Sequence, residues 1–398
     1  MAAFFAAVLF LLVLSPIITV YSLNQAVYSS TSAYNCKSYT VPLRNISAPS
    51  FNLTFEIKTQ WDITDWTINE ARRDSATAFN GIAGPSTVAG DFDISARFCT
   101  PSKLTERAET VLVMTHGAGG DKTYWDPTFA GGEQYSLVQA ALAAGYSVFH
   151  YDRLGAGQST KADPHSVVQF PIQVEILALL TQLLLAPSSP YTLNVSIASA
   201  VHFGYSYGSF ITAALASKYP ELTQAISLTG YSGIFDYFNI FIAGWQSRVA
   251  TLLDSTRWGD LRTGYVTPVD IYADAYSQFK SPYFDHSVVE WASSGRSPYA
   301  IGELATLGQM PYDTSNFNKP VQVFQGHYDL AACGGNCDSV LNRTALLWPK
   351  ASPLNITGTF PAGHAVNLHH NASLAFAAML DFVKRNIKVA GNLLFDPA

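Results

Sequence analysis

The chain has 398 residues, of which 48% are hydrophobic, 13% aromatic and only 13% charged, and its formal net charge is −6. Disordered chains combine low hydrophobicity with high charge, so this composition excludes intrinsic disorder. It also argues against nucleic-acid binding, because no dense run of Lys and Arg could neutralise phosphates. We therefore expect a folded protein of one large domain or two ordinary ones.

The first 22 residues are predicted to be a secretory signal peptide. Residues 2–20 carry no charge and are almost all apolar, and the segment ends in Val20-Tyr21-Ser22. An uncleaved membrane anchor is the alternative, because about 20 apolar residues can span a bilayer. No second run of that length follows, so we expect no stable membrane insertion once the signal is cleaved.

Two further features favour the secretory pathway. N-glycosylation sequons occur six times, at Asn45, Asn52, Asn194, Asn342, Asn355 and Asn371. The four cysteines suit disulfides in an oxidising compartment, with Cys333 near Cys337 and with Cys36 left to pair with Cys99. A metal site is the alternative, but a CxxxC segment without a nearby second pair or His is a poor zinc site, so no metal is expected.

From residue 23 onward, strand patterns come first and then alternate with helical patterns. Residues 93–100 alternate apolar and polar side chains, as an antiparallel strand with one solvated face does. Continuous apolar runs, typical of buried parallel strands, lie at 110–115, 147–150, 199–203, 225–229 and 321–324. Helical patterns lie at 135–144, 171–185, 209–218 and 374–387. This alternation predicts an α/β fold with a mostly parallel, doubly wound sheet.

One stretch, residues 231–315, interrupts the alternation and shows no clear strand. Sixteen of the residues between 231 and 312 are Phe, Tyr or Trp. An aromatic insert at the carboxyl end of a strand is expected to be a helical cap over a binding crevice, or else a helical extension with its own core. We therefore divide the chain into a signal (1–22), N-terminal strands (23–108), a core in two parts (109–230 and 316–398) and the cap (231–315).

The segment Gly204-Tyr-Ser-Tyr-Gly208 lies between a predicted strand and a predicted helix. In that context GxSxG forms a sharp turn that presents the Ser206 hydroxyl at a helix N-terminus, whereas elsewhere it can be an ordinary Gly-rich turn. A hydroxyl nucleophile needs a base. His364 is the preferred one of nine histidines, because it lies on a Gly-containing loop between the last strand pattern and the last helix; His369 and His370 follow closely.

The base in turn needs a carboxylate that fixes its tautomer. Asp329 ends the run that begins at Val321 and is the preferred acid, with Asp236 as the alternative. For the oxyanion, backbone amides are expected from Ala118, or a neighbouring glycine, and from Tyr207.

The segment from Asp152 to Ser159 contains three potentially functional features: an Asp, an Arg and a Gly-rich stretch. Asp152 and Arg153 could build a phosphate or cofactor site. However, the glycines lack dinucleotide-binding spacing. We interpret the segment as structural support for the nucleophile loop and expect no cofactor.

Together these motifs resemble the α/β-hydrolase superfamily, in its branch with an HGxGG loop (116–120), a DRxGxGxS loop (152–159) and a GxSxG elbow (204–208). The stretch from Gly363 to His369 is similar to that of secreted fungal members. The resemblance implies the α/β-hydrolase fold and the chain order Ser, Asp, His. Relatives with Asp at the elbow are epoxide hydrolases and dehalogenases, which Ser206 excludes, and the loop lacks the HGGPG form of proline iminopeptidases.

The predicted function is that of a secreted serine hydrolase, which cleaves an ester of an apolar, uncharged small molecule through an acyl-enzyme. A biosynthetic enzyme of natural-product metabolism is the alternative, acting as a hydrolase, acyltransferase, cyclase or lyase on the same three residues. A non-enzymatic binding protein is a third reading, disfavoured because all three residue types occur in the expected order. The sequence predicts no oligomeric state.

Overall fold

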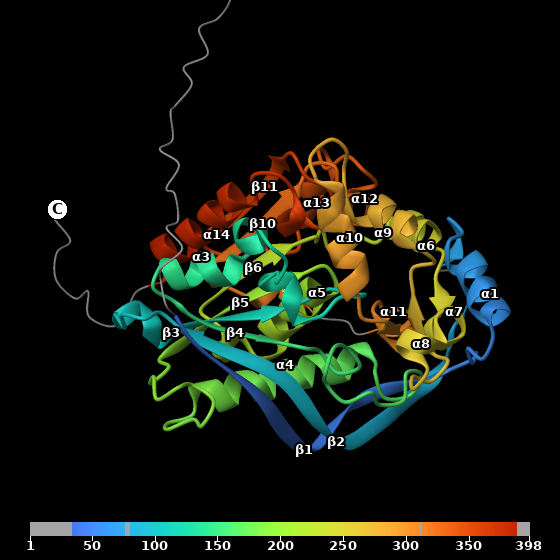
Figure 1. Ribbon diagram of the computed structural model, residues 1–398, viewed down its shortest axis with the longest axis horizontal. Coiled ribbons are helices and arrows are strands. Elements are labelled where there is room, and N and C mark those ends of the chain that lie inside the picture. Colours follow the sequence, from blue (N-terminus) through green and yellow to red (C-terminus); the bar gives the residue numbers. More distant parts are fainter. Residues whose placement is uncertain (1–33, 76–79, 310–312, 388–398) are drawn as a thin grey trace, which may run out of the picture. The chain divides into compact units, whose positions relative to one another are not determined.

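The computed structural model describes residues 34–75, 80–309 and 313–387. Its main sheet has eight strands in the order β1-β2-β4-β3-β5-β6-β10-β11 (Figure 1). The buried apolar runs of the sequence form β3 (Thr110–Thr115), β4 (Ser147–Tyr151), β5 (Ser199–Tyr205), β6 (Ala225–Thr229) and β10 (Val321–Gly326), and β11 spans Leu354–Phe360. All neighbours from β4 to β11 are parallel, which confirms the predicted sheet.

Helices cover both faces of this sheet. The predicted helices correspond to α3 (Leu137–Ala143), α4 (Phe170–Leu185), α5 (Tyr207–Lys218) and α14 (Ala372–Asn386). Helices α4 and α5 pack together on one face, and α3 and α14 pack together on the other (Figure 1). Every residue of β3, β4, β6 and β10 is buried between these layers, which is why their sequences are continuous apolar runs rather than alternating ones.

An antiparallel hairpin forms the N-terminal edge of the sheet. Strands β1 (Asn35–Leu53) and β2 (Ile82–Thr100) pair along their length, but only residues 96–99 of β2 pair with β4. The Cys36–Cys99 disulfide joins residues that are cross-strand partners, as predicted. At the far end, α1 (Gln60–Glu70) reaches the cap, because the Gln60 amide exchanges two hydrogen bonds with the backbone of Val249.

The insert between β6 and β10 is mostly helical, with three short strands that its sequence pattern does not reveal. Its helices are α6 (Phe238–Trp245), α7 (Ala250–Leu253), α8 (Ser255–Trp258), α9 (Ile271–Gln278), α10 (His286–Gly295) and α11 (Ile301–Thr306). Strands β7 (Arg248–Val249), β8 (Tyr265–Thr267) and β9 (Tyr299–Ala300) form a separate antiparallel sheet. The expectation of no strand here is wrong. Strands of two or three residues are too short to show the two-residue period by which a strand is recognised in a sequence.

After β10 the chain forms α12 (Leu330–Cys333) and α13 (Val340–Ala345) before the last strand. The second predicted disulfide, Cys333–Cys337, closes the turn between them. All four cysteines are therefore disulfide-bonded, which removes the metal alternative for them.

Three further expectations concern the signal segment, membrane insertion and glycosylation. The predicted signal segment, residues 1–22, lies outside the described residues. Within the described ranges, no helix has the length and hydropathy of a membrane span. All six sequon asparagines are exposed.

Candidate active site

Ser206 occupies a strained turn between β5 and α5. Its φ of 53° and ψ of −122° lie in a region that side-chain-bearing residues rarely adopt. Glycine is required two residues before and two residues after Ser206 because a side chain there would clash, and not because of the φ angle. A Cβ on Gly204 would lie 2.5 Å from the Cα of Ser209, and one on Gly208 would lie 2.1 Å from the carbonyl oxygen of Thr115. The GxSxG pattern thus reflects the close approach of strand, helix and neighbouring loop.

His364 lies on the loop after β11, with its ring over the carboxyl end of β5. Its Nε2 is 2.8 Å from the Ser206 Oγ, and its Nδ1 is 2.8 Å from the Asp329 Oδ2. The imidazole is buried, and the ring of Phe241 from the cap lies 5.7 Å from it, centroid to centroid. The structure therefore brings the three predicted catalytic residues into one hydrogen-bonded line.

Asp329 lies just past β10 and is fully buried. Its Oδ1 accepts a hydrogen bond from the Ala332 amide (2.8 Å), and its Oδ2 accepts one from the Gln325 side chain as well as from His364. Asp236, the alternative acid, is half exposed and forms a surface ion pair with Arg343. Only Asp329 of these two carboxylates can orient His364.

The two amides predicted to bind an oxyanion border the same cavity as Ser206. Ala118, Tyr207 and Ser206 all line it. Tyr207 is the first residue of α5, so its N–H has no partner within the helix. In the described part of the chain, neither this amide nor that of Ala118 donates a hydrogen bond. Both donors are free to bind a substrate oxygen.

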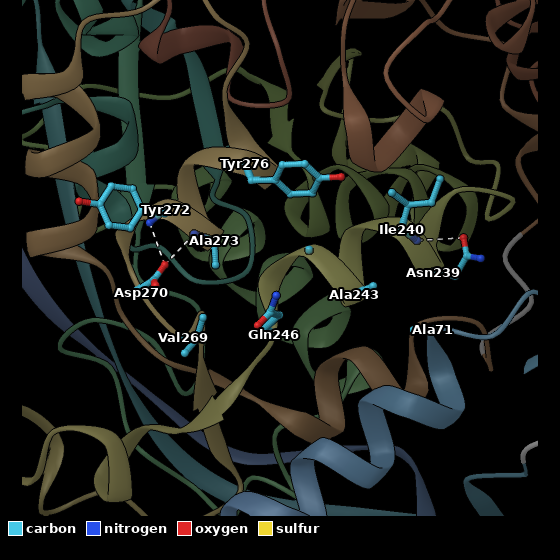
Figure 2. A pocket seen from close by; sticks show the side chains of 11 residues that line it. Ala71, Asn239, Ile240, Ala243, Gln246, Val269, Asp270, Tyr272, Ala273 and Tyr276 are labelled. Carbon is cyan, nitrogen blue, oxygen red and sulfur yellow. Dashed lines mark hydrogen bonds between the residues drawn. The ribbon is translucent and has the colours of Figure 1, made fainter.

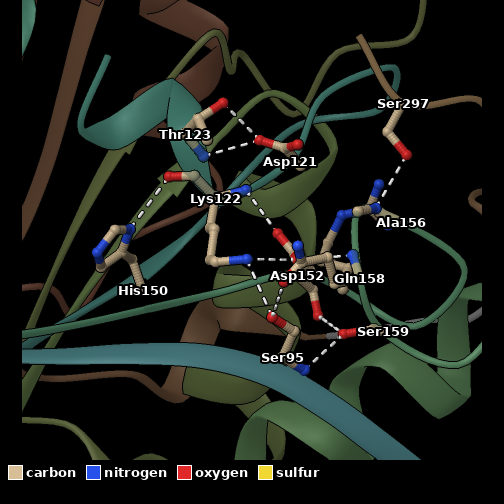
Figure 3. Close-up of polar contacts among 12 residues, drawn as sticks. Ser95, Asp121, Lys122, Thr123, His150, Asp152, Ala156, Gln158, Ser159 and Ser297 are labelled. Carbon is tan, nitrogen blue, oxygen red and sulfur yellow. Dashed lines mark hydrogen bonds and ion pairs between the residues drawn. The ribbon is translucent and has the colours of Figure 1, made fainter. Parts of the chain in front are cut away.

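The DRxGxGxS loop supports these groups through buried polar contacts (Figure 3). The Asp152 carboxylate accepts hydrogen bonds from the Lys122 backbone amide (2.9 Å), the Lys122 Nζ (2.7 Å) and the Gln158 amide (2.9 Å). Burial by itself raises the pKa of Asp152, but Lys122 and these amide donors hold it below its ordinary value. With all its acceptor sites engaged, Asp152 braces the loop that carries Ala118, in agreement with a supporting role.

Arg153 connects the DRxGxGxS loop to the cap through Glu303, a residue that the sequence patterns did not indicate. It forms a buried ion pair with Glu303 of α11. Its guanidinium also donates to the carbonyl of Gly117 (3.2 Å) and stacks 4.6 Å from the ring centre of Tyr207. Glu303 accepts a further hydrogen bond from Gln173. Glu303 carries no motif and is 150 residues from Arg153, so no local pattern could have revealed the pair.

His369 holds the loop that carries His364. Its Nε2 accepts hydrogen bonds from the amides of Gly363 (2.9 Å) and Lys280 (3.1 Å), so its Nδ1 carries the proton and donates to the Ala365 carbonyl (2.8 Å). The ring is fully buried, and burial lowers its pKa to about 4. His369 is thus a neutral structural residue.

We expect His369 to make the protein less stable as the pH falls from 6.5 toward 4. The unfolded chain protonates this imidazole near its ordinary pKa of 6.5, whereas the folded chain keeps it neutral down to about 4. The unfolded state therefore binds the proton first, and about 3 kcal/mol of stability, fully present above pH 6.5, is lost over this range. Denaturant titrations at pH 7 and pH 5 measure the effect.

The variant His369→Gln isolates this contribution. It is expected to be less stable than the wild type at pH 7 but to lose less free energy of unfolding between the two pH values. Asp274, whose pKa burial raises to about 6, acts in the opposite direction in both proteins and cancels in the comparison. Equal losses in the two proteins would contradict this role of His369.

The cavity at Ser206 is mainly apolar. Its walls include Phe210 from α5 and the cap residues Phe235, Phe238, Phe241, Leu304 and Leu307. Other cap aromatics are buried against one another, such as Tyr299, whose ring lies 5.0 Å from that of Trp245, centroid to centroid. The aromatic side chains of the insert therefore line a crevice and also pack against one another. Both predictions for the insert, a cap over a crevice and an extension with its own packing, describe part of it.

A separate hollow lies between α6, α9 and the end of α1 (Figure 2). None of the predicted catalytic residues lines it. Its acidic residue, Asp270, caps α9 by accepting hydrogen bonds from the amides of Tyr272 and Ala273. Over the described ranges, moreover, no group of three or more His, Cys, Asp or Glu is placed to hold a metal ion.

Comparisons with known proteins agree with the fold. Similar solved structures include an esterase from Thermogutta terrifontis (14% identity, TM-score 0.50, covering 75% of this chain and 96% of that one) and the esterase EaEST from Exiguobacterium antarcticum (13%, 0.51, 74% and 96%). A protein described as a non-heme bromoperoxidase, BpoC from Mycobacterium tuberculosis, is similar as well (19%, 0.51, 74% and 97%). At these identities the likeness shows the fold alone.

No curated protein sequence matches this one. The profile of the alpha/beta hydrolase family, however, matches residues 112–378, which include the elbow, the whole cap and the loop of His364. This match spans more than half of the chain and agrees with the strand order. The chain belongs to the alpha/beta hydrolase family.

Proposed function

We propose that this protein is a serine hydrolase that cleaves a carboxylic ester of an uncharged, largely apolar small molecule through an acyl-enzyme. The observation that carries the proposal is the hydrogen-bonded line from Ser206 through His364 to Asp329, beside two unoccupied backbone amides. The apolar walls of the cavity favour an apolar substrate, since a charged group there would lose its hydration without a partner.

The chemical steps follow from the positions of these groups. The Ser206 Oγ forms a bond to the ester carbonyl carbon as its proton passes to the His364 Nε2, and the carbonyl electron pair moves to the oxygen near Ala118 and Tyr207. The ester C–O bond then breaks, and His364 returns the proton to the departing alkoxide. Water, deprotonated by His364, attacks the acyl-enzyme in the same way and releases the acid.

Hydrolysis of short p-nitrophenyl esters tests the proposal. We expect Ser206→Ala to lower kcat by roughly 10⁵- to 10⁶-fold, because the nucleophile and its transferable proton are both lost. A fluorophosphonate probe should label the wild type at Ser206 and leave the variant unlabelled. The variant Ser209→Ala, one turn further along α5, is the matched control and should keep labelling. Undiminished turnover in Ser206→Ala would refute the mechanism.

We also propose that the protein is secreted and glycosylated. The two disulfides and the exposure of all six sequon asparagines support this proposal. Chain recovered from the medium of a eukaryotic host is expected to lose mass on N-glycosidase treatment and to become less soluble, because glycans supply polarity to a surface with few charges. Retention of the whole product inside the cells would count against secretion.

A further inference from the structure

A second cavity adjoins the one at Ser206, since Ala118 lines both. Its walls come from the cap helices α9 and α10, the loop after β3, and Tyr205 at the end of β5. Its lining includes side-chain hydrogen-bonding groups that the protein itself leaves unpaired. Because Ala118, one of the two predicted oxyanion donors, lines both cavities, this one is placed to receive one side of an ester.

Asp274 of α9 is the acceptor in this cavity. Asp274 is only 9% exposed, yet its carboxylate accepts no hydrogen bond from any described residue. Burial raises its pKa to about 6, with the charge of Arg296 opposing this rise, so the group is mainly ionised at pH 7. A carboxylate with so little exposure and no donor from the protein is placed to accept a hydrogen bond from a group inside the cavity.

Two donors line the same cavity. Arg296 directs its NH1 to the Asp270 carbonyl (3.3 Å), and its NH2 donates to no described residue. Gln278 accepts the Tyr205 hydroxyl at its Oε1, while its amide nitrogen donates to no described residue. Asp121 lines the cavity as well, but its Oδ1 already accepts two hydrogen bonds from Thr123. Besides Asp121, the cavity offers Asp274 as an acceptor and Arg296 and Gln278 as donors.

We propose that the second cavity binds a hydroxyl group at one end of the substrate, with Asp274 accepting the hydroxyl proton and Gln278 or Arg296 donating to its oxygen. A hydroxyl is the simplest neutral group that both donates and accepts. A substrate carboxylate would be repelled by Asp274, and an alkyl end would displace water from these groups without replacing its hydrogen bonds. This inference rests on the proposed ester hydrolysis and narrows its substrate to esters with an apolar end and a hydroxyl-bearing end.

Two matched pairs of esters test the inference. Hexyl butanoate is compared with 6-hydroxyhexyl butanoate, and butyl hexanoate with butyl 6-hydroxyhexanoate, so that the hydroxyl is offered on either side of the ester. For at least one pair, we expect the wild type to have a kcat/KM roughly tenfold or more higher for the hydroxylated ester, because a site built to hydrogen-bond a hydroxyl rejects the analogue that lacks it. Two plain esters hydrolysed as fast as their hydroxylated partners would overturn the inference.

The variant Asp274→Leu shows whether the preference arises in this cavity. The ratio of the two kcat/KM values is expected to fall to near one, and because each ratio is taken within one preparation, any loss of folded enzyme cancels. Glu290→Gln, which neutralises an exposed carboxylate on α10, is the control and should keep the wild-type ratio. A preference that persists in Asp274→Leu would also overturn the inference. Failure to hydrolyse any of the four esters, together with no probe labelling of Ser206, would instead refute the proposed function.

Discussion

Replacement of Asp329 by asparagine is expected to lower kcat/KM for ester hydrolysis by about 10⁴-fold. The carboxylate accepts the Nδ1 proton of His364 at 2.8 Å and so leaves Nε2 free to take the Ser206 proton. An asparagine amide can present its NH₂ group to Nδ1, which moves the imidazole proton to Nε2 and removes the base. The side chain keeps its size in a fully buried place, so the fold should persist.

Asp236→Asn is the matched control for this variant. Asp236 was the alternative acid in the sequence, but it lies at the surface and pairs with Arg343, so its neutralisation should change kcat/KM by no more than about twofold. Thermal unfolding of both variants checks that they are folded. A decrease of less than tenfold in Asp329→Asn, in a folded protein, would show that this carboxylate does not set the tautomer of His364.

Glu303→Leu is expected to lower the free energy of unfolding by about 3–5 kcal/mol, the largest stability effect we anticipate. The change leaves the Arg153 guanidinium buried at 1% side-chain exposure without its counter-ion. Gln173, which donates to the same carboxylate, would lose one of its two acceptors and keep the Leu154 carbonyl. Denaturant titration measures the loss. Because Arg153 also contacts Gly117 and Tyr207 beside Ser206, activity should fall even in the remaining folded fraction.

Two further variants separate the buried charge from other effects of the substitution. The double variant Arg153→Met with Glu303→Leu removes both charges and should recover much of the lost stability, since apolar replacement of a whole buried pair is often tolerated. Arg343→Ala breaks the exposed pair with Asp236 and should cost at most about 1 kcal/mol. If Glu303→Leu were no more costly than Arg343→Ala, the buried pair would not stabilise the junction of core and cap.

The core of the fold could be predicted because its strands lie between two layers of helices. Strands such as β3 and β6 are buried on both faces, and this environment produces the continuous apolar runs visible in the sequence. The strands of the cap could not be predicted, because β7 and β9 have two residues each and depend on partners 17 to 35 positions away. Pairing over such distances is set by the packing of the cap rather than by any local pattern.

Some features of the candidate site could likewise be predicted from the sequence, and others could not. The elbow could be predicted because its glycines answer a local steric need, which the contacts of Gly204 and Gly208 show. The roles of the histidines after β11 could be ranked but not settled by sequence, since His364 and His369 lie on one short segment and have the same ionisable group. Their surroundings separate them: one faces Ser206 and Asp329, and the other receives two backbone amides.

By itself, the sequence determined the class of fold, the nucleophile turn and the order of the three candidate catalytic residues, because periodicity, glycine sterics and chain order are local or linear properties. Only the tertiary structure decided that Asp329 rather than Asp236 meets His364, that Glu303 neutralises Arg153, and that Asp274 is buried without a hydrogen-bond donor from the described residues. Charge, burial and partnership depend on groups that meet only when distant segments pack together. The chain has few charged residues, but some of them are buried, and it is their positions rather than their number that shape the site.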